Sequence, residues 1–243
     1  MESEKALCRN CERPMHGEIC AHCGQKRASP IEARRVLGDI WSQFLELDFK
    51  VARAIKHLVS RPGPMIIDYW KGKRVLYTNP FKLLFFSATG YYIAIKYYDI
   101  NVGGTDDLSK ETSHFIGALL NYLIFVFLIP TAYFFKMLYA RNTINWAESY
   151  VAVSFIWSGY LMLGIPLAVL VHYSGLNYIL LRTIVGLVFI IYCTKNMFEL
   201  NWLQAIAKSI LFYLSYFIST FVVISLAIVV AHLVDYQPLM VRP

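Results

Sequence analysis

Long apolar stretches with few charges limit what this chain can fold into more than any other feature of its sequence. A helix rises about 1.5 Å per residue, so about 20 apolar residues are needed to cross a bilayer. Five stretches of about that length occur, at 80–98, 115–139, 147–173, 176–194 and 205–234. With 57% hydrophobic and 16% charged residues, the chain is too apolar for an ordinary soluble domain. We therefore predict an all-α membrane bundle of about five transmembrane helices.

The charges in the short loops predict how these helices are oriented. Cytoplasmic loops of membrane proteins carry an excess of Lys and Arg. Basic residues stand before the first stretch, after the second and around the fourth-to-fifth connection (Lys71, Lys73, Arg74, Lys82, Lys136, Arg141, Lys195 and Lys208). The loop 99–114 is acidic, and the first residues lack the apolar core of a cleavable signal peptide. We expect the N-terminus inside and the C-terminus outside.

Four cysteines near the N-terminus have the spacing of a metal site. Cys8, Cys11, Cys20 and Cys23 form C-x2-C-x8-C-x2-C, in which each pair aims two thiolates at one tetrahedral ion. Two disulfides are the alternative, but they rarely persist in a reducing cytoplasm. Iron, or a histidine ligand from His16 or His22, is a lesser alternative. Residues 1–28 are therefore predicted to form a zinc-ribbon module with a structural Zn²⁺ and no open coordination position.

Residues 29–79 are predicted to link this module to the membrane. From 31 to 59, apolar residues recur at helical spacing opposite a basic face. Such an amphipathic helix either lies in the inner headgroup layer or packs on the cytoplasmic ends of the bundle. The third region, 80–243, is the transmembrane domain.

The end of this linker, residues 61–80, is here called the collar. Pro62 and Gly63 are expected to break the preceding helix, and Pro80 to open the first span. Aromatic residues alternate with basic ones, a mixture that belongs at a headgroup boundary. The candidate contacts for a headgroup or a partner are Arg61, Pro62, Gly63, Tyr69, Gly72, Lys73, Arg74, Tyr77 and Pro80.

These motifs resemble a bacterial membrane-protein family of unknown function with an N-terminal zinc ribbon. The resemblance rests on the four cysteines, on Gly24, Gln25 and Lys26 after them, and on the collar residues named above. It covers roughly the first third of the chain, implies a bacterial inner-membrane location, and brings no activity with it. The layout also resembles the Yip family, whose members have a cytoplasmic N-terminus, five spans and an outside C-terminus.

Within the spans, the charge that most needs explaining is Arg182. An intramembrane arginine costs about 2.5 to 3.5 kcal/mol on insertion scales, so we expect a partner, with Asp99 and Asp235 as candidates. It either snorkels outward, forms a structural ion pair, or binds a substrate or anion. The sequence contains no G-x-S-x-G, HExxH or Walker loop.

The closed metal site and the lack of catalytic groups favour a non-enzymatic scaffold or adaptor. Its zinc module and basic collar would engage a cytoplasmic protein or anionic lipid headgroups. The alternative is a small-solute or ion transporter or channel that uses Arg182, and the third hypothesis is a lipid-acting membrane enzyme. The expected partners are the bilayer, a cytoplasmic protein and a second copy of the chain. No nucleic acid is expected, because no recognition-helix pattern accompanies the net charge of +7.

Overall fold

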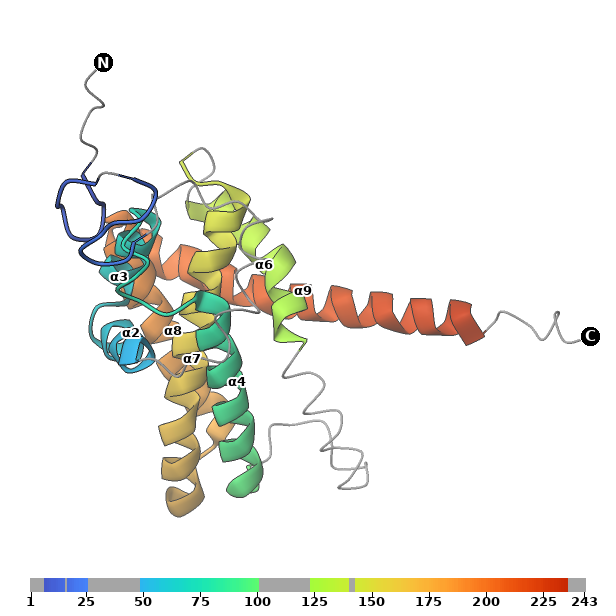
Figure 1. Cartoon of the computed structure of the whole chain (residues 1–243). Helices are drawn as coiled ribbons and strands as arrows, with labels where there is room; N and C mark the ends of the chain where they lie inside the picture. Colours follow the sequence, from blue (N-terminus) through green and yellow to red (C-terminus); the bar gives the residue numbers. More distant parts are fainter. Residues whose placement is uncertain (1–6, 16, 26–48, 101–122, 140–142, 236–243) are drawn as a thin grey trace, which may run out of the picture.

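The described part of the chain is all-helical apart from an N-terminal loop module. The structure, a computed structural model, describes residues 7–15, 17–25, 49–100, 123–139 and 143–235, excepting the side chains of 49–50 and 226–235. These residues form a module over 7–25 and seven helices (Figure 1). The helices are α2 (Phe49–Ser60), α3 (Pro62–Trp70), α4 (Pro80–Tyr97), α6 (Ile124–Tyr139), α7 (Trp146–Ser174), α8 (Tyr178–Phe198) and α9 (Trp202–Asp235).

Three of these helices are long and apolar enough to cross a membrane: α7, α8 and the Trp202–Ser225 part of α9. Their length and apolar composition are those expected of helices in a membrane protein. The other two predicted spans are not confirmed. The first corresponds to α4, which carries Lys82 and Lys96 within 18 residues. The second corresponds in part to α6, whose described 16 residues are apolar but short, while 115–122 lie outside the described residues.

Local signals fix where the long helices begin and end. Asn145 caps α7 in a reciprocal capping box with Glu148, with both side-chain bonds 2.8 Å long. Gly175, at a left-handed φ of 68°, ends that helix. Asn79 accepts the Phe81 amide at the start of α4, directly before Pro80.

The core is built around α7, which packs against α4, α6 and α8. Of its most apolar stretch, 61% is buried inside the protein, against 33% for α8 and 28% for α9. The apolar side chains that α8 and α9 leave exposed suit contact with lipid. Helix α9 crosses the direction of α4 and α7, and its C-terminal half leaves the bundle (Figure 1).

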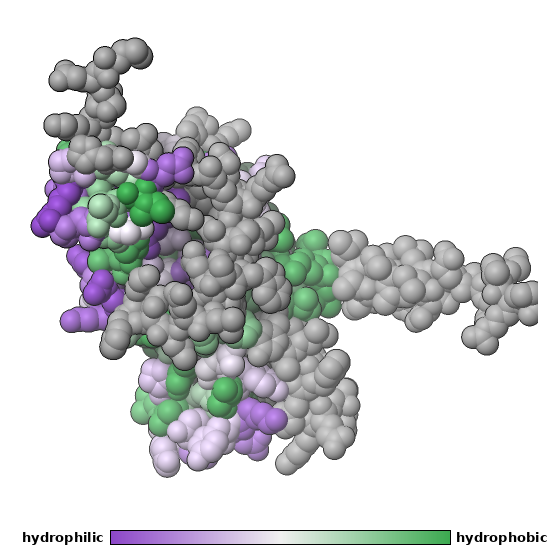
Figure 2. All heavy atoms as spheres, in the orientation of Figure 1, coloured by the Kyte–Doolittle hydropathy of each residue, from purple (hydrophilic) through white to green (hydrophobic). Residues whose placement is uncertain are grey.

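Helix α2 packs on the bundle with its apolar side. Ala54 and Leu58 are fully buried, whereas Arg53 and Lys56 on the opposite side are exposed. For 49–60 the apolar side of the predicted amphipathic helix therefore faces protein, next to Gly159 within α7 rather than at the end of that helix. Residues 31–48 lie outside the described residues. Hydrophilic side chains gather over the module, α2 and α3 (Figure 2).

The collar contains a helix that the sequence did not predict. The chain breaks at Arg61 as expected, but α3 then runs from Pro62 to Trp70 and packs against α8. Helix α3 can pack this closely on α8 because Gly63 has no side chain. A Cβ at Gly63 would lie 2.9 Å from the carbonyl oxygen of Cys193 and 3.0 Å from the Met197 amide nitrogen. Both are backbone atoms of α8, so neither can give way easily.

Gly63→Ala is expected to force α3 away from α8 and to destabilise the protein by about 1 to 3 kcal/mol, as overpacking usually does. Gly90→Ala is the matched control, because its Cβ would meet only the Cδ1 atom of Ile165, at 3.4 Å. The measurement is the thermal unfolding midpoint of the full-length protein in detergent. Equal midpoints for the two variants would show that the contact between α3 and α8 is looser than described.

Candidate metal centre and its collar

The four N-terminal thiols converge on one point. The Sγ atoms of Cys8, Cys11, Cys20 and Cys23 all lie within 4.8 Å of one another. Cys8 pairs with Cys23 and Cys11 with Cys20, each pair at 3.6 Å. Four thiolates at about 2.3 Å from a tetrahedral zinc ion would stand about 3.8 Å apart, so the arrangement fits one metal ion. Each close pair joins the two halves of the module, as a shared ion requires.

The two halves have the same backbone fold. In the first, the Cys8 amide donates to the Arg13 carbonyl over 2.9 Å, and the Glu12 amide donates to the Cys8 carbonyl over 2.8 Å. The second half repeats both bonds among Cys20, Gln25 and Gly24. Glu12 and Gly24 both have left-handed backbones, at φ 59° and 71°. A glycine suits this conformation at position 24, whereas at position 12 no glycine marks it in the sequence.

The thiols of the module differ in how readily they ionise. Backbone amides of Cys23 and His22 lower the pKa of the Cys20 thiol to about 6, whereas the pKa of the Cys11 thiol is raised to about 12. The thiolate is the form that binds metal, so Cys20 reaches that form more readily than Cys11. The side chain of His22 is exposed, and His16 lies outside the described residues.

The module is docked on the collar through Gln25. The Val75 amide donates to Gln25 Oε1 over 3.1 Å, and Gln25 is only 5% exposed. Gln25 is the last described residue of the module, and Val75 directly follows Arg74 in the collar. This bond joins two regions that the sequence treats as separate.

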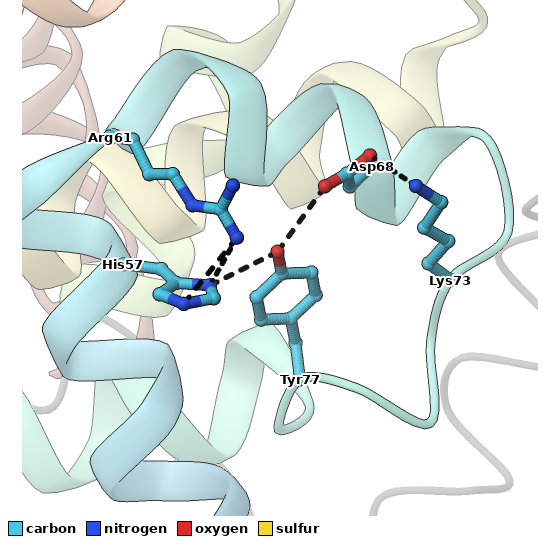
Figure 3. Close-up of polar contacts among 5 residues, drawn as sticks. All are labelled: His57, Arg61, Asp68, Lys73 and Tyr77. Atoms are coloured by element: carbon cyan, nitrogen blue, oxygen red, sulfur yellow. Dashed lines mark hydrogen bonds and ion pairs between the residues drawn. The ribbon is translucent and has the colours of Figure 1, made fainter. Parts of the chain in front are cut away.

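The collar is held by a polar network centred on Asp68 (Figure 3). Asp68 Oδ1 accepts from Lys73 Nζ at 3.0 Å, and Asp68 Oδ2 accepts from the Tyr77 hydroxyl at 3.4 Å. The Tyr77 hydroxyl also lies 3.2 Å from His57 Nδ1 on α2, and Tyr77 is 2% exposed. Sequence reasoning named Lys73 and Tyr77 but missed His57 and Asp68. The available signal was that Asp68 is the one acidic residue among seven basic ones in 49–79.

Arg61 completes this network from above the imidazole. Its Nη2 atom lies 3.2 Å from His57 Nδ1 and 3.4 Å from Nε2. Because Tyr77 donates its hydroxyl proton to Asp68, we assign the proton of neutral His57 to Nδ1, which then donates to Tyr77. Desolvation, followed by the charge of Arg61, lowers the pKa of His57. The fold therefore favours the neutral imidazole.

Most other collar residues serve packing. Tyr69 packs edge-on against Phe155 of α7 at 5.1 Å between ring centroids. The Trp70 indole donates to the Glu148 carbonyl over 3.0 Å. Gly72 takes a φ of 100°, which favours glycine. With Lys73 paired to Asp68, the exposed cations on this side are Arg53, Lys56, Arg61 and Lys71 among the described residues of α2 and the collar.

Arg182 meets aromatic rings. Its guanidinium carbon lies 4.4 Å from the centroid of the Tyr91 ring on α4 and 4.6 Å from that of Tyr160 on α7. Asp99, a predicted partner, forms no ion pair with Arg182 in the described structure, and the side chain of Asp235 lies outside it.

A cavity of about 420 Å³ opens at the ends of α4, α7 and α8. It is lined by Asp99, Ile100, Val171, Leu176, Asn177, Tyr178 and Ile179.

The purified full-length protein is expected to carry one metal ion per chain. Cys20→Ser should lose it, because a hydroxyl does not replace the thiolate in a four-sulfur site. Cys193→Ala is the control, since Cys193 is buried in α8 away from the module. Elemental analysis of metal per chain makes the comparison. Metal retained in Cys20→Ser, or lost in Cys193→Ala, would contradict the four-thiolate site.

The lowered pKa of His57 predicts an acid sensitivity. Above the model-peptide pKa of 6.5 the imidazole is neutral in both folded and unfolded chains. Below it, the unfolded chain takes up a proton first, so the free energy of unfolding falls as the pH drops. Unfolding midpoints at about pH 7.5 and about pH 5.5 measure this loss. His57→Gln should show a smaller loss between the two; an unchanged loss would exclude His57 as the source.

Comparison with known proteins assigns a family model to a short part of the chain. A family model described as "Protein of unknown function (DUF3667)" matches residues 48–91. This stretch holds α2, the collar and the first part of α4, and with them every residue of the Asp68 network. No curated protein and no solved structure matches the chain. The match agrees with the resemblance to an uncharacterised family, but it tests neither the four-cysteine motif nor the layout likeness to the Yip family.

Proposed function

We propose that this chain is a non-enzymatic membrane scaffold whose metal module and collar form one cytoplasmic platform. The platform engages a cytoplasmic protein or anionic lipid headgroups. The proposal rests on the hydrogen bond from the Val75 amide to Gln25 Oε1, because this bond joins the metal module and the collar into one surface. The Asp68 network, which fixes the loop holding Val75, supports it.

The metal in this proposal is zinc in a structural role. Four thiolates close a tetrahedral shell and leave no position for water or substrate. A module of this size has too small a core to fold alone: the described part buries only Cys8, Met15 and Cys20 fully among its apolar side chains. Metal binding can supply the missing folding energy, on the order of 10 kcal/mol.

The proposed location is a bacterial inner membrane with the module in the cytoplasm. Basic residues before the first span support this orientation through the positive-inside tendency. Arg53 and Lys56 of α2 and Arg61 and Lys71 of the collar are all exposed and add to the positive charge of this segment. An anionic lipid surface or an acidic protein surface would meet complementary charge there.

A scaffold is favoured over the other candidates by how the polar groups are used. In the collar, Lys73, Tyr77 and His57 interact with one another or with Asp68, which suits rigidity more than chemistry. A transporter would need a polar path from the cavity near Asp99 toward the collar. The middle of α7 instead carries large buried apolar side chains, among them Phe155, Ile156 and Trp157.

Photocrosslinking of the full-length protein in its membrane tests the platform. A photoreactive residue in place of exposed Lys71 should crosslink to a defined protein or to anionic lipid, and mass spectrometry tells the two apart. Gln25→Ala removes a hydrogen bond worth about 1 kcal/mol, so it should shift the docked module toward the free state about fivefold and lower the yield. Cys20→Ser should lower it further, and Cys193→Ala should not. If neither Gln25→Ala nor Cys20→Ser lowers the crosslinking yield, the proposed platform is refuted.

A further inference from the structure

Arg182 is a cation in an apolar helix, and it forms no hydrogen bond with the described residues. It lies one turn inside the N-terminal end of α8, and its Nε is buried without a hydrogen-bond partner. The residue as a whole is half-buried, so the terminal amino groups are the part of the guanidinium that is not enclosed. In the described part of the chain no carboxylate within ion-pair distance meets it.

Two aromatic rings already contact the guanidinium. Tyr91 and Tyr160 contribute ring faces at 4.4 and 4.6 Å, each worth about 0.5 to 2 kcal/mol as a cation–π contact. Together they offset much of the insertion cost of about 2.5 to 3.5 kcal/mol. Ring faces attract the charge but accept none of the N–H groups in the guanidinium plane. Among the described residues, no acceptor meets the edge of the guanidinium.

Two glycines leave the space that the Tyr91 and Tyr160 rings occupy beside Arg182. A Cβ at Gly164 of α7 would lie 2.8 Å from the Tyr91 ring, and a Cβ at Gly186 of α8 would collide with the Tyr160 ring. Gly186 is one turn beyond Arg182 on the same helix. Any larger residue at either position would therefore displace a ring from the guanidinium.

Neighbouring hydroxyls offer one further donor. The Tyr160 and Tyr213 hydroxyls lie 3.1 Å apart and share one hydrogen bond. Whichever oxygen accepts that bond still carries its own proton, so the pair keeps one O–H free to donate. Tyr178, which also interacts with Arg182, forms part of the wall of the 420 Å³ cavity. The cavity wall thus includes Tyr178, which is four residues before Arg182 on α8.

We propose that Arg182 binds a phosphate oxyanion, presented either by a lipid headgroup or by free phosphate. The planar fork of a guanidinium matches the oxygens of a phosphate, and a negative charge there neutralises the buried cation. The start of α8, with its positive dipole end, lies one turn away and favours the same charge. This site is separate from the metal module and does not rest on the scaffold function.

Ligand-induced stabilisation of the full-length protein in detergent tests the site. The two probes are inorganic phosphate and short-chain phosphatidylglycerol, each raising the unfolding midpoint if it binds the folded state. Arg182→Gln removes the donor. Lys195→Gln is the matched control, since Lys195 is also a helix cation over an aromatic ring, 4.7 Å from Trp202. General salt effects of phosphate act on both variants alike and cancel in the comparison.

Wild-type protein and Lys195→Gln are expected to be stabilised, and Arg182→Gln is not. A response to phosphate alone assigns a soluble ligand, and a response to the lipid only assigns a headgroup. If Arg182→Gln does not fold, Arg182→Lys serves instead; it keeps the charge without the fork and should bind about tenfold more weakly or worse. The proposal is overturned if neither probe stabilises the wild type, or if the Arg182 variant that folds responds as the wild type does.

Discussion

Asp68 accepts from both Lys73 and Tyr77, and these two bonds fold the loop after α3 back over the helix that carries the carboxylate. The ion pair itself is partly exposed, with side chains 36% and 22% accessible, so its direct contribution to stability is at most about 1 kcal/mol. Its importance is geometric. The same loop presents the Val75 amide to Gln25, so the position of the metal module depends on the loop that Asp68 closes.

The collar in turn depends on close backbone contacts with the membrane helices. Gly63 lets α3 approach the backbone of α8, and Leu58 of α2 would lie 3.2 Å from a Cβ at Gly159 of α7. Gly159 is 13 residues after Trp146, about 20 Å along the helix. The helices α2 and α3 therefore run beside the first half of α7 rather than capping its end. A segment read from sequence as a linker is a structural part of the bundle.

Two cations in this chain are accommodated in opposite ways. Lys73 lies in a half-exposed setting and is paired with a carboxylate, whereas Arg182 lies among helices and is held between tyrosine rings. Water can stabilise the first with little help from the protein. The second has only protein, lipid or a bound ligand around it, which is why its unused N–H groups carry more information about function than the larger number of surface charges.

The sequence by itself determined the features that short-range rules govern. Apolar length predicted helices for the membrane, cysteine spacing predicted a four-thiol site, and Pro62 and Pro80 marked local breaks in the helices. Only the tertiary structure decided which surfaces meet. Gln25 and Val75 are 50 residues apart, and His57, Asp68 and the rings around Arg182 come from different elements. Helical periodicity specifies the side of a helix a residue occupies, but its partner is chosen by packing between distant segments, which no local pattern records.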